Sequence, residues 1–456
     1  LPITMHVLVA LAAATLILSN ICPALGLTNS TTLLLPEDAL LNFTQLAVED
    51  GYVLQMFRIP GFKDRNISPW TFPVLLMHGI LDTADTWVLR GKESLAITLA
   101  DAGYDVWCGN VRGNRYSRRH VRLDPDRDRE FWDFSFEQHG LLDLPSLIDR
   151  VLLETGAPRL NAIGHSQGNT IFYVLGSSRP EYNSKVNSLT ALAPVCYLQH
   201  VPNPLAKLIQ LSPVLFWKAE AVRLDEFPGR ALTQYARKLC TKPVVGYAKC
   251  VLGILFSLEG ADPGELEPPF FRSLLGHFPS GTSAKNLYHF GQVGRRRSFA
   301  RFDYGPARNV EVYGDAVPPE FELSRVTMPV VLLVGANDRI SVVDDVALLR
   351  ARLPHVAEYT VLARRLTNHV DFVLGPVSHP VAYRSVIERG ELPADGDLPE
   401  VKQILDRRRS GEVLEHDDAE GGIDLGHVVS DERIYRLQTQ KVRADRRGAG
   451  QPDDRQ

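Results

Sequence analysis

Three features are scarce in this sequence, and each scarcity excludes a class of protein. Neither sign of charge is in large excess: 50 Lys and Arg against 54 Asp and Glu give a formal net charge of −4, so nucleic acid is not an expected partner. The five cysteines have no metal-ligand spacing, and no metal or other cofactor is expected. No apolar run reaches the roughly 20 residues of a bilayer-spanning helix, so no transmembrane segment is expected. The 45% hydrophobic and 23% charged content is that of an ordinary globular protein.

The apolar run near the N-terminus predicts a signal peptide. Residues 7–18 are apolar or small, apart from Thr15, and the run is too short for a bilayer core. Ala24 and Gly26 then place small residues at the two positions that a signal peptidase inspects. We therefore expect residues 1–26 to be removed, with cleavage after Ala24 as a second choice. A retained signal anchor is the alternative.

Two further features favour the secretory pathway, and with it a secreted or lysosomal protein. Asn29, Asn42 and Asn66 each begin a triplet that accepts an N-linked glycan. Cys240 and Cys250 close a short loop and are a candidate disulfide, which an oxidising compartment would preserve.

The middle and late parts of the chain alternate between buried strands and helices. Short continuous apolar runs indicate strands covered on both faces, and longer runs with helical periodicity separate them. This alternation predicts a mostly parallel central sheet flanked by helices. The predicted strands are 72–77, 104–107, 160–163, 189–195, 328–334 and 358–362, and the predicted helices are 93–102, 142–154, 170–177 and 342–353.

The alternation stops between about residues 197 and 325, which predicts a mainly helical insertion. We therefore expect a first part of the core at 27–196, a helical cap or lid at 197–325, and a second part of the core at 326–389. Residues 390–456 have few aromatic residues and mixed charge, which predicts a disordered tail. The most apolar stretches of the cap, 205–217 and 251–258, are candidates to line an apolar binding site or to contact an apolar surface. Most of their residues are nevertheless expected to fill the cap's own core.

Ser166 is the candidate nucleophile. Gly164-His165-Ser166-Gln167-Gly168 fits the G-x-S-x-G pattern of a sharp turn from strand to helix, in which a strained serine points its hydroxyl outward. Glycine is needed two residues to either side because side chains there would collide. The motif lies between a predicted buried strand and a predicted helix, which is the required context. The alternative is a serine in an ordinary strand-to-helix turn.

The acid partner is expected after a late strand. In an α/β-hydrolase the order along the chain is serine, acid, histidine. Asp338 follows the predicted strand 328–334 and is the candidate acid. The alternative is a cap of the next helix, a role for which Asp344 and Asp345 are better placed.

The base should lie beyond the last strand, where His369 is the candidate. His379 is a weaker rival, and His355 precedes the strand and is expected in a surface loop. Asp371 is expected to be structural, since it is too close in sequence to approach the Nδ1 atom of His369 from behind.

Two backbone N–H groups should receive the negative oxygen of a tetrahedral intermediate. One belongs to the residue after the serine, which is Gln167. The other comes from the loop after an early strand, where His-Gly-Ile-Leu at 78–81 makes Ile80 the candidate.

With these residues assembled, the chain resembles the acid lipase family, which contains gastric and lysosomal acid lipases. The resemblance runs from about residue 45 to 388 in the family's order, although the usual lead-in between residues 28 and 48 is not recognisable. The segments that carry it are Glu-Asp-Gly-Tyr-Val-Leu at 49–54, His-Gly-Ile-Leu at 78–81, Asp-Val-Trp at 105–107, Gly-Asn-Val-Arg-Gly-Asn at 109–114, Phe-Trp-Asp-Phe-Ser-Phe at 131–136, Asp-Leu-Pro at 143–145, the Ser166 turn, Ala-Pro-Val at 193–195 and Asn-His-Val-Asp-Phe at 368–372.

The resemblance implies an α/β-hydrolase core with a helical cap, and hydrolysis of acylglycerols or cholesteryl esters at a lipid–water interface. Ser166, Asp338 and His369 fall on the family's triad positions, and Ile80 and Gln167 on its oxyanion positions. Cys240 and Cys250 sit near the cap disulfide of some members. The remaining cysteines of the predicted mature chain, Cys108 and Cys196, are expected at the ends of strands that two other strands separate, and thus as buried free thiols.

The sequence therefore predicts a secreted or lysosomal lipase that cleaves carboxylic esters of lipids through an acyl-enzyme. Two alternatives stay open. One is an esterase for small or isoprenoid esters, because the cap rather than the triad decides the substrate. The other is an inactive homologue that only binds lipid.

Overall fold

In the computed structural model, the described residues are 39–61, 72–229, 233–234, 238–240, 246, 248–261, 266, 268–362 and 367–375. The predicted signal peptide, the acceptors Asn29 and Asn66, the rival base His379 and the predicted tail lie outside them. The third glycan acceptor, Asn42, is exposed at the start of the first strand.

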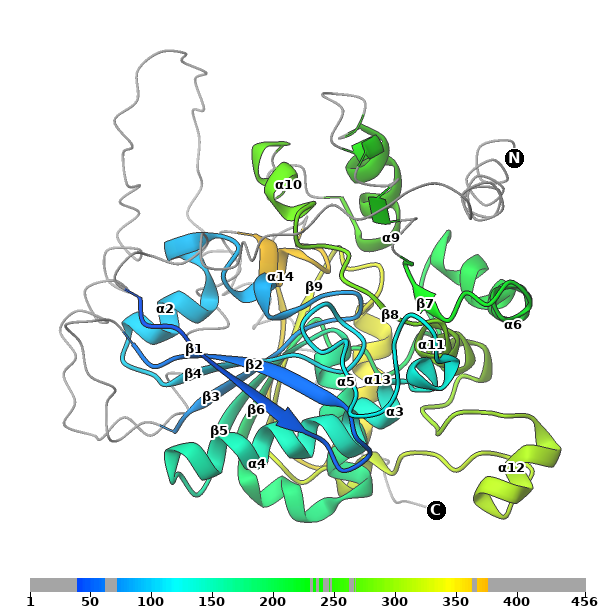
Figure 1. Ribbon diagram of the computed structural model, residues 1–456, viewed down its shortest axis with the longest axis horizontal. Coiled ribbons are helices and arrows are strands. Elements are labelled where there is room, and N and C mark those ends of the chain that lie inside the picture. Colours follow the sequence, from blue (N-terminus) through cyan, green and yellow to red (C-terminus); the bar gives the residue numbers. More distant parts are fainter. Residues whose placement is uncertain are drawn as a thin grey trace, which may run out of the picture. The chain divides into compact units, whose positions relative to one another are not determined.

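An eight-stranded sheet forms the centre of the fold, with strand order β1-β2-β4-β3-β5-β6-β9-β10 (Figure 1). Along the run β4-β3-β5-β6-β9-β10 each strand is parallel to the next, whereas β2 pairs antiparallel with both β1 and β4. The predicted mostly parallel sheet is thus confirmed. The strands are β1 (Asn42–Ala47), β2 (Val53–Ile59), β3 (Val74–Met77), β4 (Val106–Gly109), β5 (Leu160–His165), β6 (Val186–Leu192), β9 (Val330–Gly335) and β10 (Val356–Leu362).

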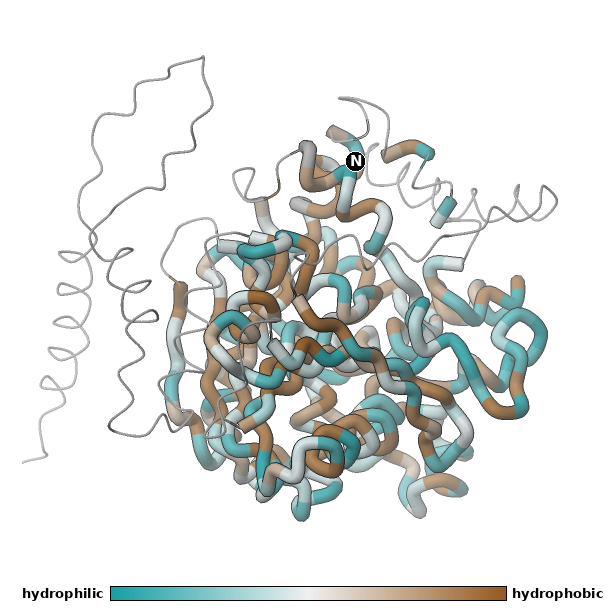
Figure 2. The backbone as a smooth tube through the Cα atoms, turned by 60° about the vertical axis from the view of Figure 1, so that its left-hand side comes forward, coloured by the Kyte–Doolittle hydropathy of each residue, from teal (hydrophilic) through white to brown (hydrophobic). Residues whose placement is uncertain are grey.

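Helices pack against this sheet and complete the core. The parallel strands β3, β4, β5 and β9 are buried at every residue, because helices and loops cover both of their faces. Figure 2 shows hydrophobic stretches running through this part of the molecule. The core helices and short helical turns are η2 (Ala84–Trp87), η3 (Gly91–Glu93), α2 (Leu95–Asp101), η4 (Arg129–Trp132), α3 (Phe136–Gln138), η5 (His139–Asp143), α4 (Leu144–Thr155), α5 (Gln167–Ser178), η6 (Pro180–Lys185), α13 (Val343–Arg352) and α14 (Asp371–Leu374).

Between β6 and β9 the chain forms a mainly helical insertion, which we call the cap. Its helix α11 packs along α6, and two short strands, β7 and β8, pair antiparallel. Cys240 and Cys250 are joined by a disulfide, with their Cα atoms 5.8 Å apart, as predicted. The described elements are α6 (Leu205–Ala221), β7 (Glu226–Phe227), η7 (Ala248–Leu255), α9 (Phe256–Glu259), α10 (Pro268–Leu274), β8 (Thr282–Ser283), α11 (Ala284–Arg296), α12 (Pro306–Tyr313) and η8 (Leu323–Arg325).

The prediction that most residues of the stretches 205–217 and 251–258 fill the cap's own core is wrong for the residues that the structure describes there. In α6 only Ile209 is buried, and Trp217 is 66% exposed. In η7, Leu252 and Ile254 are exposed while Val251 is buried. The other exposed apolar side chains of α6 are Leu211, Val214 and Leu215, and together with Trp217 they form what we call the α6 apolar face.

The antiparallel strands β1 and β2 were not predicted from the sequence. Side chains of β1 are exposed or half-buried along its whole length, so no continuous apolar run marks it. In β2, buried residues alternate irregularly with half-buried ones, as in a strand near a sheet edge. Cys108 and Cys196 are buried free thiols, and the strand order places β3 and β5 between their strands, as expected.

No helix among the described residues combines the length and the apolar character that crossing a bilayer requires.

Candidate active site

Ser166 lies between the end of β5 and the start of α5, in the backbone conformation that a sharp strand-to-helix turn imposes. Its φ of 53° and ψ of −118° are strained for a residue with a side chain. The Ser166 N–H donates to the carbonyl of Leu192 at 3.1 Å, which ties the turn to the neighbouring strand β6. This strained turn holds the hydroxyl at the carboxyl end of the parallel sheet, where loops from several strands converge.

The two glycines of the motif are required by close packing. A Cβ atom on Gly168 would lie 2.1 Å from the carbonyl oxygen of Met77, and one on Gly164 would lie 2.3 Å from Oδ1 of Asn169. Neither space admits a side chain. The first glycine lets the turn close on itself, and the second lets α5 begin directly against β3.

His369 lies between Ser166 and Asp338. Its Nε2 atom is 2.9 Å from Ser166 Oγ, and its Nδ1 atom is 2.9 Å from Oδ2 and 3.2 Å from Oδ1 of Asp338. All three side chains are buried. With the carboxylate accepting from Nδ1–H, the unprotonated Nε2 faces the serine hydroxyl, which is the tautomer that a general base needs.

Asp338 also orders its own loop. Its Oδ1 atom accepts hydrogen bonds from the N–H groups of Ile340 and Ser341, at 2.8 and 2.7 Å. Asp344 and Asp345, which are better placed in the sequence to cap the following helix, do not cap it, since α13 begins after Val342 without a side-chain cap. The carboxylate of Asp345 instead pairs with His200.

The pKa of His369 is raised above its ordinary value by its surroundings. Burial by itself lowers this pKa, but the Asp338 carboxylate and its hydrogen bond, together with the nearby Glu259, outweigh burial and favour the imidazolium. The carboxylates that raise this pKa thereby stabilise the protonated histidine that forms when the serine loses its proton.

The loop predicted to bind the oxyanion, residues 78–81, lies against the serine, and we call it the oxyanion loop. A Cβ atom on Gly79 would be 3.3 Å from Ser166 Cβ and 3.1 Å from Nδ1 of His165, so any larger residue here would press on the serine turn. His78 anchors the loop, with Nδ1 2.7 Å from the carbonyl oxygen of Gly79 and Nε2 3.1 Å from Nδ2 of Asn114. Leu81 has a φ of 61°, a further strained position. The predicted donor Ile80 lies within this loop.

Gln167, the second predicted donor, is the first residue of α5. The N–H groups in the first turn of a helix have no acceptor within the helix, and the helix dipole adds positive potential there. The backbone N–H of Gln167 is therefore suited to bind a negative oxygen next to Ser166.

His165 contributes a contact that sequence reasoning missed. Its Nε2 atom is 2.9 Å from the carbonyl oxygen of His369, and the two rings lie 5.0 Å apart. Burial lowers the pKa of His165 to about 3, so the ring is neutral and donates from Nε2. His165 occupies a variable position of the motif, and nothing in the sequence pattern marks it.

Glu259, at the end of α9, was also missed. Its carbonyl oxygen accepts from the N–H groups of His369 and Arg339, at 3.3 and 3.4 Å, so the cap touches the base loop and the acid loop together. Burial raises the pKa of the Glu259 carboxyl to about 7. Asp82, next to the oxyanion loop, has a pKa raised by burial to about 7 as well, and its charge acts on Glu259.

The remaining residues that the sequence singled out lie away from Ser166 or support the loops. Asp371 accepts from the N–H of Asn368 through Oδ2 at 2.8 Å, which is the structural role expected for it. His355 is exposed and precedes β10, at the opposite end of the parallel strands. Arg112 is buried and paired with Asp143.

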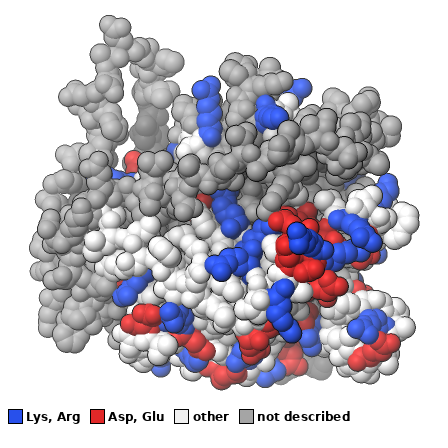
Figure 3. Space-filling view, viewed as in Figure 1, with Lys and Arg blue, Asp and Glu red and all other residues white. Residues whose placement is uncertain are grey.

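Charged side chains of both signs are interspersed on the face shown in Figure 3. Arg118 pairs with Asp126 and Glu226, and Arg129 pairs with Asp225. Among the described residues, no group of His, Cys, Asp and Glu side chains is arranged to hold a metal ion.

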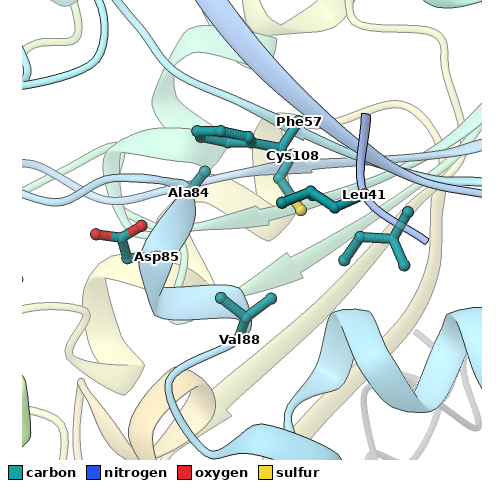
Figure 4. A pocket seen from close by; sticks show the side chains of 7 residues that line it. Leu41, Phe57, Ala84, Asp85, Val88 and Cys108 are labelled. Carbon is teal, nitrogen blue, oxygen red and sulfur yellow. The ribbon is translucent and has the colours of Figure 1, made fainter. Parts of the chain in front are cut away.

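A small apolar pocket lies apart from the predicted site residues, between the β1–β2 hairpin and η2 (Figure 4). None of its lining residues belongs to the triad or the oxyanion loop. They are Leu41, Phe57, Ile59, Ala84, Asp85, Val88 and Cys108.

The sheet, the strained serine turn and the serine–histidine–aspartate contacts together define an α/β-hydrolase. Comparison with known families agrees: the alpha/beta hydrolase fold model matches residues 73–376, and a partial alpha/beta-hydrolase lipase region matches residues 44–91.

Curated relatives narrow the family further. Lipase 1 of Drosophila melanogaster is 36% identical over 354 residues, which cover 76% of this chain and 76% of that protein. Gastric triacylglycerol lipase of Rattus norvegicus is 34% identical over 347 residues, covering 75% of this chain and 86% of the relative. Lipase member K of Homo sapiens is 33% identical over 348 residues, covering 75% and 85%. The chain belongs to the acid lipase family of α/β-hydrolases and is a serine carboxylic ester hydrolase.

Proposed function

We propose that the protein is a secreted or lysosomal lipase whose catalytic residues are Ser166, His369 and Asp338. The observation that carries the proposal is the chain of two 2.9 Å contacts from Asp338 through His369 to the hydroxyl of the strained Ser166. A serine hydroxyl becomes an effective nucleophile only when such a base removes its proton and a third group orients the base.

The reaction proceeds in two halves. His369 Nε2 takes the proton as Ser166 Oγ attacks the ester carbonyl, and the Asp338 carboxylate stabilises the imidazolium. The tetrahedral oxyanion is bound by the N–H groups of Ile80 and Gln167. His369 then protonates the departing alcohol, leaving an acyl-serine. Water, deprotonated by the same histidine, attacks this ester; the bond to Ser166 then breaks, His369 returns the proton to Ser166 Oγ, and the fatty acid is released.

The α6 apolar face supports a lipid substrate. Four large apolar side chains are exposed on this helix, namely Leu211, Val214, Leu215 and Trp217. An exposed apolar patch on a protein of this kind marks an interaction surface, and tryptophan suits the boundary between water and lipid. We assign to this face the contact with the lipid–water interface. The relatives named for lipase activity agree with acylglycerols or related lipid esters as substrates.

The proposed organisation follows the predicted boundaries. Residues 27–196 and 326–389 form the hydrolase core, 197–325 form the cap, residues 1–26 direct the chain to the secretory pathway, and 390–456 form a tail. The exposed acceptor Asn42, with Asn29 and Asn66, would then carry glycans, as a route through the secretory pathway allows.

The test is a pH-resolved assay on triacylglycerol and cholesteryl ester emulsions, with a serine-directed phosphonate as active-site label and Ser166→Ala as control. We expect hydrolysis of at least one emulsion and labelling of the wild type but not of the variant. Preference for short soluble esters, with no activity on emulsions, would instead support an esterase of small or isoprenoid esters. Failure of the phosphonate to label Ser166 would support an inactive lipid-binding protein.

A further inference from the structure

The side chain of Gln167 is buried and held at both ends. Its Oε1 atom accepts a hydrogen bond of 2.6 Å from Nδ2 of Asn286 in the cap helix α11. Its Nε2 atom is 3.3 Å from Nδ1 of His139, whose pKa is lowered by burial far enough to leave that ring neutral. The proposed reaction uses only the backbone N–H of Gln167, so these side-chain contacts require another explanation.

Asn286 is fixed in one orientation by the core. Its Oδ1 atom accepts from the backbone N–H of Phe136 at 2.7 Å, and an N–H can only donate. The amide nitrogen of Asn286 must therefore face the other way, toward Gln167 Oε1 and Thr282 Oγ1 at 3.0 Å. Asn286 is completely buried, so water offers no substitute for these contacts. The amide is thus a rigid donor supplied by the cap.

The cap helix α11 also packs against α6, the helix whose apolar face is exposed. A Cβ atom on Gly291 would lie 2.5 Å from Ser212 Cβ, and one on Gly294 would lie 2.8 Å from Ile209 Cγ2, so α11 and α6 are in close contact. The rings of Phe216 and Tyr288 stack between them at 4.3 Å. The helix that holds Gln167 is thereby packed directly against the helix that bears the α6 apolar face.

We propose that Asn286 is a positioning residue that couples the cap to the oxyanion hole, by clamping the Gln167 side chain and so fixing the direction of its backbone N–H. This proposal rests on the proposed function. The backbone of Ser166 is strained, with a positive φ. The peptide group between Ser166 and Gln167 would therefore rotate toward a more relaxed conformation if no contact held it in place. An oxyanion donor is effective only when it is already aimed at the developing charge. The clamp therefore acts on kcat rather than on substrate binding.

The experiment is a double-mutant cycle on the full chain. Asn286→Ala removes the clamp from the cap side, and Gln167→Met removes it from the core side while keeping the backbone N–H. Activity is measured on p-nitrophenyl butyrate and on its thiono analogue, whose sulfur is a weak hydrogen-bond acceptor and gains little from an oxyanion hole. Asn309→Ala is the matched control, because Asn309 is another completely buried cap asparagine whose hydrogen-bond partners, Asp303, Tyr304 and Ala316, all lie in the cap.

We expect each clamp variant to lower kcat for the oxygen ester about 10- to 100-fold, less than the 10²–10³-fold loss of a donor outright. KM should change less than about threefold, and the double variant should lose no more than the worse single variant, because both remove one interaction. The loss on the thiono ester should be several-fold smaller, and Asn309→Ala should keep the kcat of the wild type.

Three results would overturn the proposal: clamp variants with wild-type kcat, losses that multiply in the double variant, or equal losses on both esters, which indicate general damage. If Asn286→Ala does not fold, Gln167→Met alone decides, since an unchanged kcat there rejects the clamp. A wild type that neither cleaves the ester nor reacts with the phosphonate rejects the proposed function, and the clamp with it.

Discussion

The core strands and the cap helix α6 differ in how much of their apolar surface they bury. Strands of the core, such as β5 and β9, are buried at every position, whereas the 17-residue helix α6 of the cap buries only Ile209. A buried sheet with tightly packed loops holds catalytic groups within small tolerances. An exposed apolar helix gains free energy only when something else covers it. The difference supports the proposal that the core carries out the chemistry and that the cap contacts the lipid substrate.

The largest expected effect comes from the core and should not depend on the substrate's physical state. We expect His369→Ala to lower kcat by about 10⁴–10⁶-fold and Asp338→Asn by about 10⁴-fold, because each removes or misorients the base. Each variant should lose the same factor of kcat on a soluble ester as on a triacylglycerol emulsion. A loss confined to emulsions would contradict the assignment of these residues to the bond-breaking step.

Changes on the α6 apolar face should separate the two substrates. We expect the double variant Leu215→Ser, Trp217→Ser to lose roughly 10- to 100-fold of its activity on emulsions, since a lipid interface buries only part of each side chain and full burial contributes about 1.5–3 kcal/mol per side chain. Its kcat/KM on p-nitrophenyl butyrate should stay within about twofold. Val310→Ser, Val317→Ser is the matched control, because these side chains are also exposed in the cap but lie on or after α12. Equal losses in both double variants would argue against a specific role for α6.

A smaller effect should show that the cap reaches into the chemistry. The charge of Glu259 is among the causes that raise the pKa of His369, so Glu259→Gln should lower that pKa and keep the base neutral at lower pH. Because the Glu259 carboxyl itself has a pKa of about 7, its charge acts on His369 mainly near and above that pH, so we expect the acid limb of the kcat/KM profile to move to lower pH, with activity near pH 7 up to about twofold above that of the wild type. The exposed Glu322→Gln serves as control. An acid limb that stays in place or moves to higher pH would refute the coupling.

The smallest expected effect is on stability. Folding raises the pKa of Asp82 and of Glu259 to about 7, so between their unfolded values and about 7 the folded protein binds more protons than the unfolded chain. Their contribution to the free energy of unfolding is complete below the unfolded pKa values and is lost as pH rises through 7. Buried histidines such as His165, with lowered pKa values, act in the opposite direction.

Asp82→Asn combined with Glu259→Gln isolates the two carboxyls. Denaturant unfolding at about pH 5 and about pH 7.5 should show that the difference between variant and wild type grows in the variant's favour as pH rises. A difference that is constant with pH would mean that these carboxyls do not titrate between the two conditions.

Local patterns predicted the parallel strands because full burial leaves a continuous apolar run, as at residues 328–334. They did not predict β1, because a strand with exposed or half-buried side chains has no such run. The exposure of apolar residues on the cap helix α6 was missed because periodicity does not reveal the environment of a helix. An apolar helix reads alike in the sequence whether its side chains face a core or the solvent, so the exposure of Trp217 was not foreseen.

The sequence by itself indicated Ser166 as the candidate nucleophile and explained the glycine two residues to either side of it, because the turn is local and its steric demands fall on nearby residues. Chain order then indicated Asp338 and His369. Only the tertiary structure decided that Asn286, 119 residues after Gln167, would donate to its side chain, and that His165 would bond to the backbone of His369. These contacts depend on where the cap and the loops come to rest, and no local pattern of residues encodes that position.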